Sequence, residues 1–244
     1  MKPFLILQLR PETEASDDEY QAMLDKGGLA ATDTVRIRLD QESIPSDLDL
    51  KNHAGVIVGG GPGCVSDHEA AKPEMEKRIE DEIFGLMPQI TENDVPYLGC
   101  CYGIGILAHH LKGDVSKKRY GEEVGAVECS ITDEASNDPL LEGLPDRFMA
   151  FVGHKEAVQD LPPGCTHLLA SAPCPFQMIR FKNNVYATQF HPEADSAVFE
   201  ARINIYKDRG YFPPSSADRL IDYCHQQDVR FPGQILKNFV DLYR

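Results

Sequence analysis

Two adjacent cysteines stand in the segment Gly99-Cys100-Cys101-Tyr102-Gly103, directly after a short apolar run. A nucleophile on a sharp turn from a strand into a helix needs glycine two positions before it and two after it, because the strained turn brings those neighbours into contact. Only Cys101 has that framing, since the equivalent neighbours of Cys100 are Leu98 and Tyr102. A position at a helix N-terminus also lowers a thiol pKa. We therefore predict that Cys101 is a nucleophile and that Cys100 packs beneath it.

A cysteine nucleophile needs a base, and His191 is the candidate in the segment Gln189-Phe190-His191-Pro192-Glu193. Pro192 restricts the backbone of the histidine before it, and Glu193 is near enough to bond the imidazole and fix its tautomer. A histidine at the end of a strand is by itself more often a surface residue. Together with the cysteine turn, however, this segment predicts a catalytic triad of Cys101, His191 and Glu193.

A third segment, Gly59-Gly60-Gly61-Pro62-Gly63, follows another strand-like apolar run. A turn of this kind can present backbone N–H groups to an anion, either a phosphate or the oxyanion of an acyl intermediate. It lacks the Lys-Ser or Lys-Thr ending of a nucleotide-binding P-loop and does not match GxGxxG. The sequence therefore favours an oxyanion over a nucleotide phosphate.

The elements that must position these residues alternate between strands and helices. Apolar runs of strand length occupy residues 4–9, 35–39, 55–58 and 95–98, and the spaced apolar residues of 67–87 predict a helix. Another helix is expected after Gly103, closed by Gly113. This alternation predicts an α/β fold with a parallel sheet, and it places Cys101 at a strand-to-helix turn.

The second half of the chain changes character. Residues 124–189 contain short β-rich pieces separated by turns such as Leu161-Pro162-Pro163-Gly164, which predicts an additional antiparallel portion. From 194 onward the pattern is helical, with breaks at 210–214 and 231–233. We expect one domain over 1–244, with a core over about 1–195 and a helical extension over about 196–244.

Composition narrows the class of protein. The 244 residues are 42% hydrophobic and 26% charged, as in globular domains. The formal charge of −15 repels phosphate backbones and anionic lipids, so we expect no nucleic-acid or membrane partner. No run reaches the ~20 apolar residues of a membrane span and the first residues do not resemble a signal peptide, so we expect a cytoplasmic protein.

The cysteines and histidines predict no further cofactor chemistry. Seven cysteines form neither a CxxC pair nor the spacing of a disulfide framework. No ligand spacing repeats among the cysteines and histidines, so we predict no metal site and no cofactor. A vicinal pair such as Cys100 and Cys101 can form a sulfenic acid or a strained disulfide, which keeps redox sensing as a minor alternative.

The three segments GGGPG, GCCYG and QFHPE, in this order, resemble the class I glutamine amidotransferase family, including the glutaminase portion of GMP synthase. The resemblance covers about residues 1–195. It implies a stand-alone, flavodoxin-like glutaminase domain in which Cys101 attacks the side-chain amide of glutamine and releases ammonia and a γ-glutamyl thioester. His191 and Glu193 would drive hydrolysis of the thioester, and the backbone amides of Gly61 and Tyr102 would form the oxyanion hole.

By the same resemblance, Gly60, Gly105 and His154 are the expected substrate-binding residues. Two of these positions depart from the family pattern. The family usually has glutamine two residues after the second glycine of the cysteine turn, and here that residue is Gly105. The family also tends to have a His-Gly-Asp-like segment, which here is His154-Lys155-Glu156.

Three functions follow from these residues. The first is a glutaminase whose ammonia goes to a separate synthetase subunit, since the chain contains neither a P-loop nor a synthetase-like segment. The second is a hydrolase of another γ-glutamyl amide or small amide, with a pocket altered by Gly105. The third is a non-catalytic binding or regulatory protein that keeps the fold.

Overall fold

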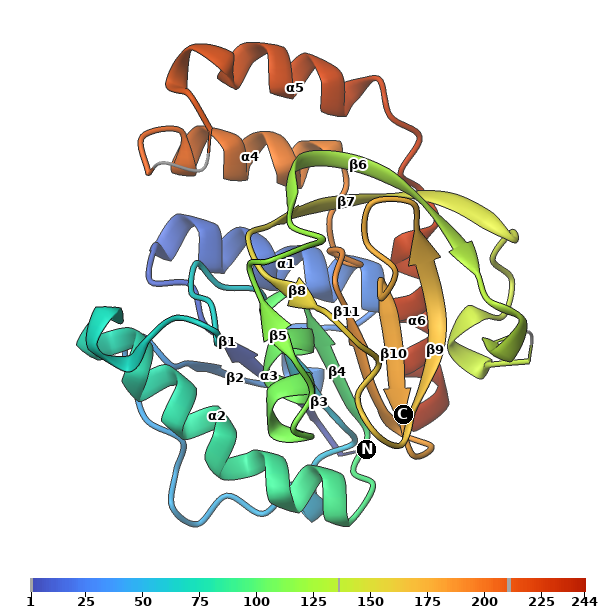
Figure 1. Ribbon diagram of the computed structural model, residues 1–244. Helices are drawn as coiled ribbons and strands as arrows, with labels where there is room; N and C mark the ends of the chain where they lie inside the picture. The colour runs from blue at the N-terminus through green and yellow to red at the C-terminus, as the bar shows by residue number, and fades with distance from the viewer. Residues whose placement is uncertain (1, 136, 210–211) are drawn as a thin grey trace.

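The computed structural model describes residues 2–135, 137–209 and 212–244. A nine-stranded sheet crosses the molecule in the order β2-β1-β3-β4-β11-β10-β9-β6-β7, and β5 pairs with β8 in a separate two-stranded sheet (Figure 1). The strands are β1 (Phe4–Gln8), β2 (Thr34–Arg38), β3 (Val56–Val58), β4 (Tyr97–Cys100), β5 (Val115–Ser116), β6 (Glu122–Ile131), β7 (Arg147–His154), β8 (Ala157–Val158), β9 (Cys165–Ser171), β10 (Met178–Phe181) and β11 (Val185–Thr188).

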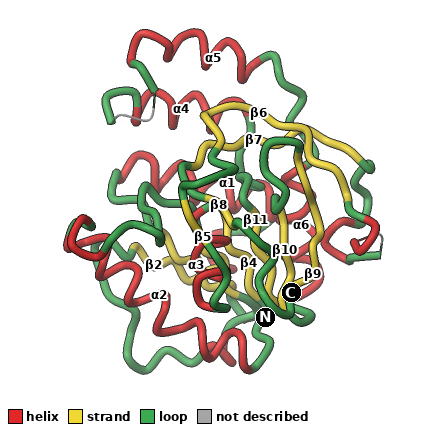
Figure 2. Tube along the Cα trace, viewed as in Figure 1, coloured by secondary structure: helices red, strands yellow, loops and turns green. Residues whose placement is uncertain are grey.

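The sheet has a parallel half and an antiparallel half. Strands β2, β1, β3, β4 and β11 pair in parallel. Their order is the 2-1-3-4-5 order of flavodoxin-like folds, with β11 as the fifth strand. The remaining strands β10, β9, β6 and β7 pair antiparallel, and β6 and β7 extend beyond the parallel half (Figures 1 and 2).

Helices cover both faces of the sheet. They are α1 (Thr13–Gly27), α2 (Glu74–Glu92), α3 (Tyr102–His110), α4 (Ser196–Tyr206), α5 (Ala217–His225) and α6 (Pro232–Tyr243). Helices α1 and α6 pack on one face of the parallel half, while α2 and α3 pack on the other. Helices α4 and α5 lie against each other at the end of the molecule where β6 passes (Figure 1).

The strands are apolar on both faces because both faces are covered. In β1, Phe4 and Ile6 point into the core beneath α1 and α6, whereas Leu5 and Leu7 point into the core beneath α2 and α3. This alternation is the two-residue period of a strand, and continuous apolar runs are typical of buried parallel strands. A third apolar cluster fills the space under α4 and α5.

The strand register brings the three predicted segments to one edge of the sheet. Val58 pairs with Gly99 and Thr188 pairs with Cys100, so the glycine turn, the cysteine turn and the turn at His191 leave adjacent strand ends. All of these are carboxyl ends of parallel strands, the edge where open α/β sheets bind their ligands.

The predicted fold class is confirmed: a parallel core flanked by helices, an antiparallel portion and C-terminal helices. The prediction that all of 124–189 belongs to the antiparallel portion is wrong for β11, which pairs in parallel with β4 and closes the parallel half. Helix α2 begins at Glu74 rather than at 67, because Pro73 fixes an extended backbone before it. Helix α1 was not predicted. The predicted break at 231–233 coincides with the start of α6, whereas residues 210 and 211 of the other break lie outside the described residues.

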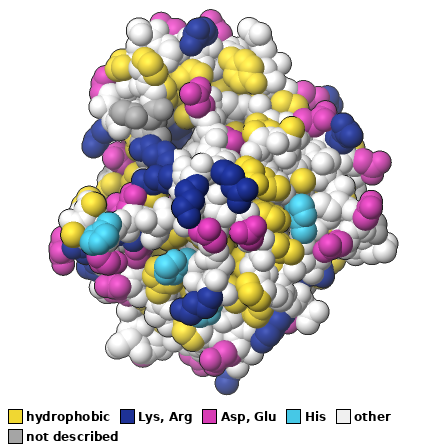
Figure 3. Space-filling view, viewed as in Figure 1, with side chains coloured by type: hydrophobic (Ala, Val, Ile, Leu, Met, Phe, Trp, Pro, Cys, Tyr) yellow, Lys and Arg dark blue, Asp and Glu magenta, His cyan; other side chains and the backbone are white. Residues whose placement is uncertain are grey.

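Charged side chains of both signs share the surface. Lys and Arg side chains gather near the middle of the face in Figure 3, below α4 and α5, with Asp and Glu side chains beside them. Among the described residues, none of the helices combines the length and apolarity that crossing a membrane requires.

Candidate active site

Cys101 occupies the strained turn that its glycine framing predicted. Its backbone has φ 52° and ψ −92°, a positive-φ conformation outside the allowed regions for a residue with a side chain. A Cβ on Gly99 would lie 2.9 Å from the backbone of Gly103, so the turn closes only with glycine there. The N–H of Cys101 donates to the carbonyl of Thr188 over 2.7 Å, which ties the turn to β11. Backbone strain of this kind is stored at functional sites.

Cys100 points the other way, into the core beneath α1 and α6. It is buried among Phe and Leu side chains, and burial raises the pKa of its thiol. This agrees with the predicted structural position beneath Cys101. The two adjacent cysteines therefore have different surroundings.

His191 and Glu193 form a buried pair. The Nδ1 atom of His191 lies 3.0 Å from Oε1 of Glu193, and both side chains are at most 5% exposed. The N–H of His191 donates to the carbonyl of Phe151 over 3.1 Å, and the ring of Phe199 packs edge-on against the imidazole. A proton on Nδ1 leaves Nε2 free to accept one, and His191 lines the same cavity as Cys101.

Arg202 of α4 completes this pair, and sequence analysis did not find it. Its Nη2 donates to Oε1 of Glu193 over 2.7 Å, and its Nη1 lies 3.0 Å from Nδ1 of His191. No local motif marks Arg202, because it reaches the site only when α4 packs against the sheet edge. With the Nδ1 proton donated to Glu193, the guanidinium, which can only donate, faces Nδ1 as a neighbouring positive charge and not as a hydrogen-bond partner.

A second buried ion pair supports the glycine turn. Glu19 of α1 accepts from Nε of Arg10 over 2.7 Å and from the N–H of Gly60 over 3.2 Å. A Cβ on Gly59 would lie 2.2 Å from Oε1 of Glu19, and one on Gly60 would lie 2.9 Å from the ring of His191. The glycines are therefore required by close packing. Arg10 could have been noticed from sequence, because it follows the first buried strand and so lies at the same sheet edge.

Burial determines the protonation of the resting site. It raises the pKa of the Cys101 thiol to about 12, although Arg10 opposes this. Burial also lowers the pKa of His191, although Glu193 opposes this. Burial alone would raise the pKa of Glu193, but His191 and Arg202 outweigh it and hold that pKa well below its usual range. The resting site thus holds a neutral thiol, a neutral imidazole and a carboxylate, contrary to the lowered thiol pKa expected from the helix N-terminus.

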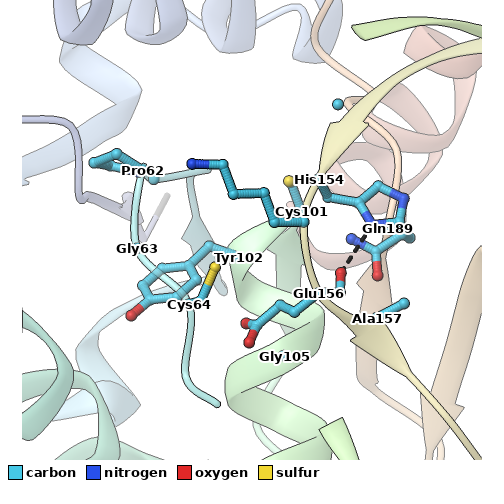
Figure 4. Close-up of a pocket in the computed structure, with 13 residues that line it drawn as sticks. Pro62, Gly63, Cys64, Cys101, Tyr102, Gly105, His154, Glu156, Ala157 and Gln189 are labelled. Atoms are coloured by element: carbon cyan, nitrogen blue, oxygen red, sulfur yellow. Dashed lines mark hydrogen bonds between the residues drawn. The ribbon is translucent and has the colours of Figure 1, made fainter. Parts of the chain in front are cut away.

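Two cavities open on either side of Cys101 and share Cys101, Gly61 and Gly153. We call the first the acyl cavity. Figure 4 shows Cys101, His154, Glu156 and Gln189 around it. The residues that line it are Gly61, Pro62, Gly63, Cys64, Cys101, Tyr102, Gly105, Gly153, His154, Lys155, Glu156, Ala157 and Gln189.

Glu156 occupies the space beside Gly105. A Cβ on residue 105 would lie 3.0 Å from Oε1 of Glu156. The carboxylate accepts from the N–H groups of Val65 and Ser66, each over 2.9 Å, and so holds the loop that follows the glycine turn. Gln189 lines the same cavity, and its amide oxygen is buried without a hydrogen-bond partner among the described residues.

The second cavity is lined on one side by α4 and the segment after it, and we call it the distal cavity. Its walls are mostly apolar, with two arginines. The residues that line it are Arg10, Gly61, Cys101, Val124, Gly153, His191, Phe199, Arg202, Ile203, Tyr206 and Phe212.

His154 belongs to a separate buried group. Its Nε2 lies 2.7 Å from Oε2 of Glu122, and its Nδ1 lies 2.8 Å from the carbonyl of Glu156. With the thiol of Cys174, these side chains place one potential metal-ligand atom each within 4.8 Å of one another. Burial raises the pKa of the Cys174 thiol to about 12, and Cys174 does not line either cavity. The pairing of Glu122 with His154 fixes the segment that carries Glu156.

The predicted site residues are thus distributed as follows. Gly61 lines both cavities, and Tyr102 is the first residue of α3, where a backbone N–H has no acceptor within the helix. Gly105 and His154 line the acyl cavity. Gly60 lines neither cavity, and its N–H donates to Glu19.

The model of the family "Glutamine amidotransferase class-I" matches residues 18–205. The chain belongs to the class I glutamine amidotransferase family. GMP synthase [glutamine-hydrolyzing] of Thermosipho melanesiensis is 32% identical over 154 residues, which are 62% of this chain and 26% of that enzyme. The same enzyme of Streptococcus pneumoniae is 30% identical over 184 residues, 70% of this chain and 31% of that enzyme. This amidotransferase chain therefore spans about a third or less of the length of these curated relatives.

Solved structures share the amidotransferase fold. A glutamine amidotransferase from Thermotoga maritima superposes with a TM-score of 0.76 at 18% identity, covering 100% of this chain and 98% of that one. A glutamine amidotransferase from Methylobacillus flagellatus superposes with a TM-score of 0.69 at 17% identity, covering 100% of this chain and 96% of that one. A chain of PurLQS from Thermotoga maritima superposes with a TM-score of 0.54 at 18% identity, covering 84% of this chain and 99% of that one. The family match places the predicted nucleophile and base inside its bounds.

Proposed function

We propose that this chain is a cysteine-dependent amide hydrolase that converts glutamine to glutamate and ammonia through a γ-glutamyl thioester. The observation that carries the proposal is the strained backbone of Cys101 beside a cavity that it shares with His191. A residue that served only packing would have no need of that conformation. The buried Glu193, held ionised by Arg202, gives the imidazole a fixed orientation.

In the first step, Nε2 of His191 would take the thiol proton as Sγ of Cys101 attacks the amide carbon. Because burial raises the pKa of the thiol, His191 would have to take this proton before or during the attack. The negative charge that develops on the carbonyl oxygen would be bound by the backbone N–H groups of Gly61 and Tyr102.

In the second step, His191 would return the proton to the leaving nitrogen as the C–N bond breaks and ammonia departs. Water then attacks the thioester, with His191 as the base, and glutamate leaves as the thiol is restored. The acyl cavity suits a glutamyl group, because the unpartnered oxygen of Gln189 can accept from an ammonium group. The ammonia would pass to a separate synthetase subunit, the role that the family resemblance implies, or to solvent.

The test is release of ammonia from glutamine by the wild-type protein and by Cys101→Ala. Cys165→Ala is the matched control, because Cys165 is also a free thiol but lines neither cavity. We expect activity in the wild type and in the control, and none in Cys101→Ala with an unchanged circular dichroism spectrum. Undiminished release by Cys101→Ala would contradict the proposal.

A further inference from the structure

The distal cavity lies on the side of Cys101 where a leaving group must depart. Of the two cavities that share Cys101, only the distal one is lined by His191. The group that protonates the leaving nitrogen must be within hydrogen-bond reach of it. The nitrogen and whatever it carries therefore face the distal cavity, while the acyl part of the amide faces the acyl cavity.

The distal cavity is larger than ammonia requires. Its volume is about 60 Å³, against about 30 Å³ for the acyl cavity that would hold the glutamyl group, and a single water needs roughly 10–15 Å³ on the same kind of measure. Ammonia is about the size of water, so most of the space would stay unused with glutamine as the substrate. A substituent on the leaving nitrogen would fill it.

The walls indicate the chemistry of that substituent. Val124, Phe199, Ile203 and Phe212 form an apolar surface from β6, α4 and the segment after it. Arg10 and Arg202 also line the cavity, and none of its described lining residues is acidic. Both arginines are in buried ion pairs, Arg10 with Glu19 and Arg202 with Glu193, and these carboxylates do not line the cavity, so a ligand carboxylate would bind the N–H groups that the pairs leave over. The surface thus combines an apolar wall with two guanidinium groups.

We propose that the distal cavity is a leaving-group subsite and that, besides glutamine, the site hydrolyses γ-glutamyl amides of apolar α-amino acids, which it prefers. This rests on the amide hydrolase proposed above and names its substrate class. The apolar side chain of the leaving amino acid packs against Phe199, Ile203 and Phe212, and its α-carboxylate faces Arg10 and Arg202.

The reaction is a simple hydrolysis. The Cys101 sulfur forms a bond to the γ-carbonyl carbon, the C–N bond breaks, and the amino acid leaves with the proton from His191. Water then replaces the thiol, so that one amide and one water give glutamate and a free amino acid. No oxidant, reductant or cofactor enters the balance.

The first experiment compares kcat/KM for γ-glutamylphenylalanine, γ-glutamylglycine and glutamine. The first two share the α-carboxylate and differ only in the side chain. We expect γ-glutamylphenylalanine to exceed both others by at least about tenfold, since even a single methylene in an apolar pocket changes specificity by roughly 10- to 200-fold. Equal values for the two γ-glutamyl amino acids, or a preference for glutamine, would overturn the subsite. Turnover of none of the three would overturn the amide hydrolase itself.

The second experiment fills the cavity with Val124→Phe. We expect the ratio of kcat/KM for γ-glutamylphenylalanine to that for glutamine to fall at least about tenfold, because the added ring occupies the subsite. Val127→Phe is the matched control on the same strand, because Val127 does not line the distal cavity, and it should leave the ratio unchanged. An unchanged ratio in a folded Val124→Phe protein would overturn the subsite.

If Val124→Phe does not fold, a second variant that removes an apolar side chain from the distal cavity tests the same proposal. Phe212→Ala should lower kcat/KM for γ-glutamylphenylalanine but not for γ-glutamylglycine. Phe231→Ala, a partly buried phenylalanine in the separate core beneath α6, should not change their ratio. Equal losses on both substrates in Phe212→Ala would contradict the assigned apolar wall.

Discussion

Nη2 of Arg202 lies 2.7 Å from Oε1 of Glu193, in a site where both side chains are buried. The same guanidinium contacts Nδ1 of His191 and lowers its pKa, in addition to the larger effect of burial. Arg202 therefore acts on the base in two ways: it keeps Glu193 ionised and it disfavours the imidazolium. A base with a lowered pKa stays neutral, and so able to take a proton, down to a lower pH.

Arg202→Met should consequently change the pH profile as well as the rate. Loss of the nearby positive charge raises the pKa of His191, so the acid limb of kcat/KM should move to higher pH. We expect kcat to fall at least about tenfold, because the orientation of the imidazole is loosened. The measurement is kcat/KM against pH for the wild type and the variant.

Arg209→Met is the control for this prediction. Arg209 lies just beyond α4, and its exposed guanidinium is 3.7 Å from Glu12 rather than at the site. Its removal should leave the acid limb in place. A profile that shifts equally in both variants would show that Arg202 acts only through the overall charge or fold.

The Cys101 thiol should react slowly with alkylating agents at neutral pH. Burial raises its pKa to about 12, so the thiolate fraction falls tenfold for each pH unit below that value. The rate of alkylation by iodoacetamide, followed at Cys101 by mass spectrometry, should rise without a plateau up to about pH 10. A plateau below about pH 8 would instead show an ion pair of thiolate and imidazolium in the resting site.

The proximity of Cys101, His191 and Glu193 could be predicted from sequence because each segment has a local signature. The glycines around Cys101 and the proline after His191 mark turns, and the parallel sheet brings adjacent strand ends together whatever the side chains are. The ion pairs that Arg10 and Arg202 form with Glu19 have no such signature in the sequence. These residues come from a loop and two helices, and they meet only through the packing of α1 and α4 at the sheet edge.

Helix α1 was not predicted from the sequence for a related reason. Its sequence, TEASDDEYQAMLDKG, is rich in acids, and Glu19 occupies a fully buried position where an apolar residue would complete the helical period. Glu19 is buried because it binds Arg10 and Gly60, so the residue that serves the site interrupts the pattern that would have predicted the helix. Binary patterning fails where a buried polar group has a function.

Glu156→Ala should destabilise the fold. Its carboxylate accepts from Val65 and Ser66, and hydrogen bonds to a charged group each contribute roughly 1.5–3 kcal/mol. We expect a loss of about 3 kcal/mol in the free energy of unfolding, or roughly 6–12 °C in Tm for a chain of this size. Glu123→Ala, which removes an exposed carboxylate of β6, should change Tm little. Similar values for both variants would mean that Glu156 does not hold the loop.

Gly59→Ala should destabilise the protein and lower its activity, whereas Gly85→Ala should stabilise it. The new Cβ at 59 would lie 2.2 Å from Oε1 of Glu19, so either the glycine turn or the Arg10–Glu19 pair must shift. Overpacking of this kind destabilises by roughly 1–3 kcal/mol. A Cβ at 85, inside α2, meets nothing within 4 Å, and alanine there gains about 0.5–1 kcal/mol over glycine. Thermal unfolding and kcat/KM, measured for both variants, distinguish the effects of Gly59→Ala and Gly85→Ala. An unaltered Tm in Gly59→Ala would mean that a Cβ at residue 59 fits beside Glu19 without a clash.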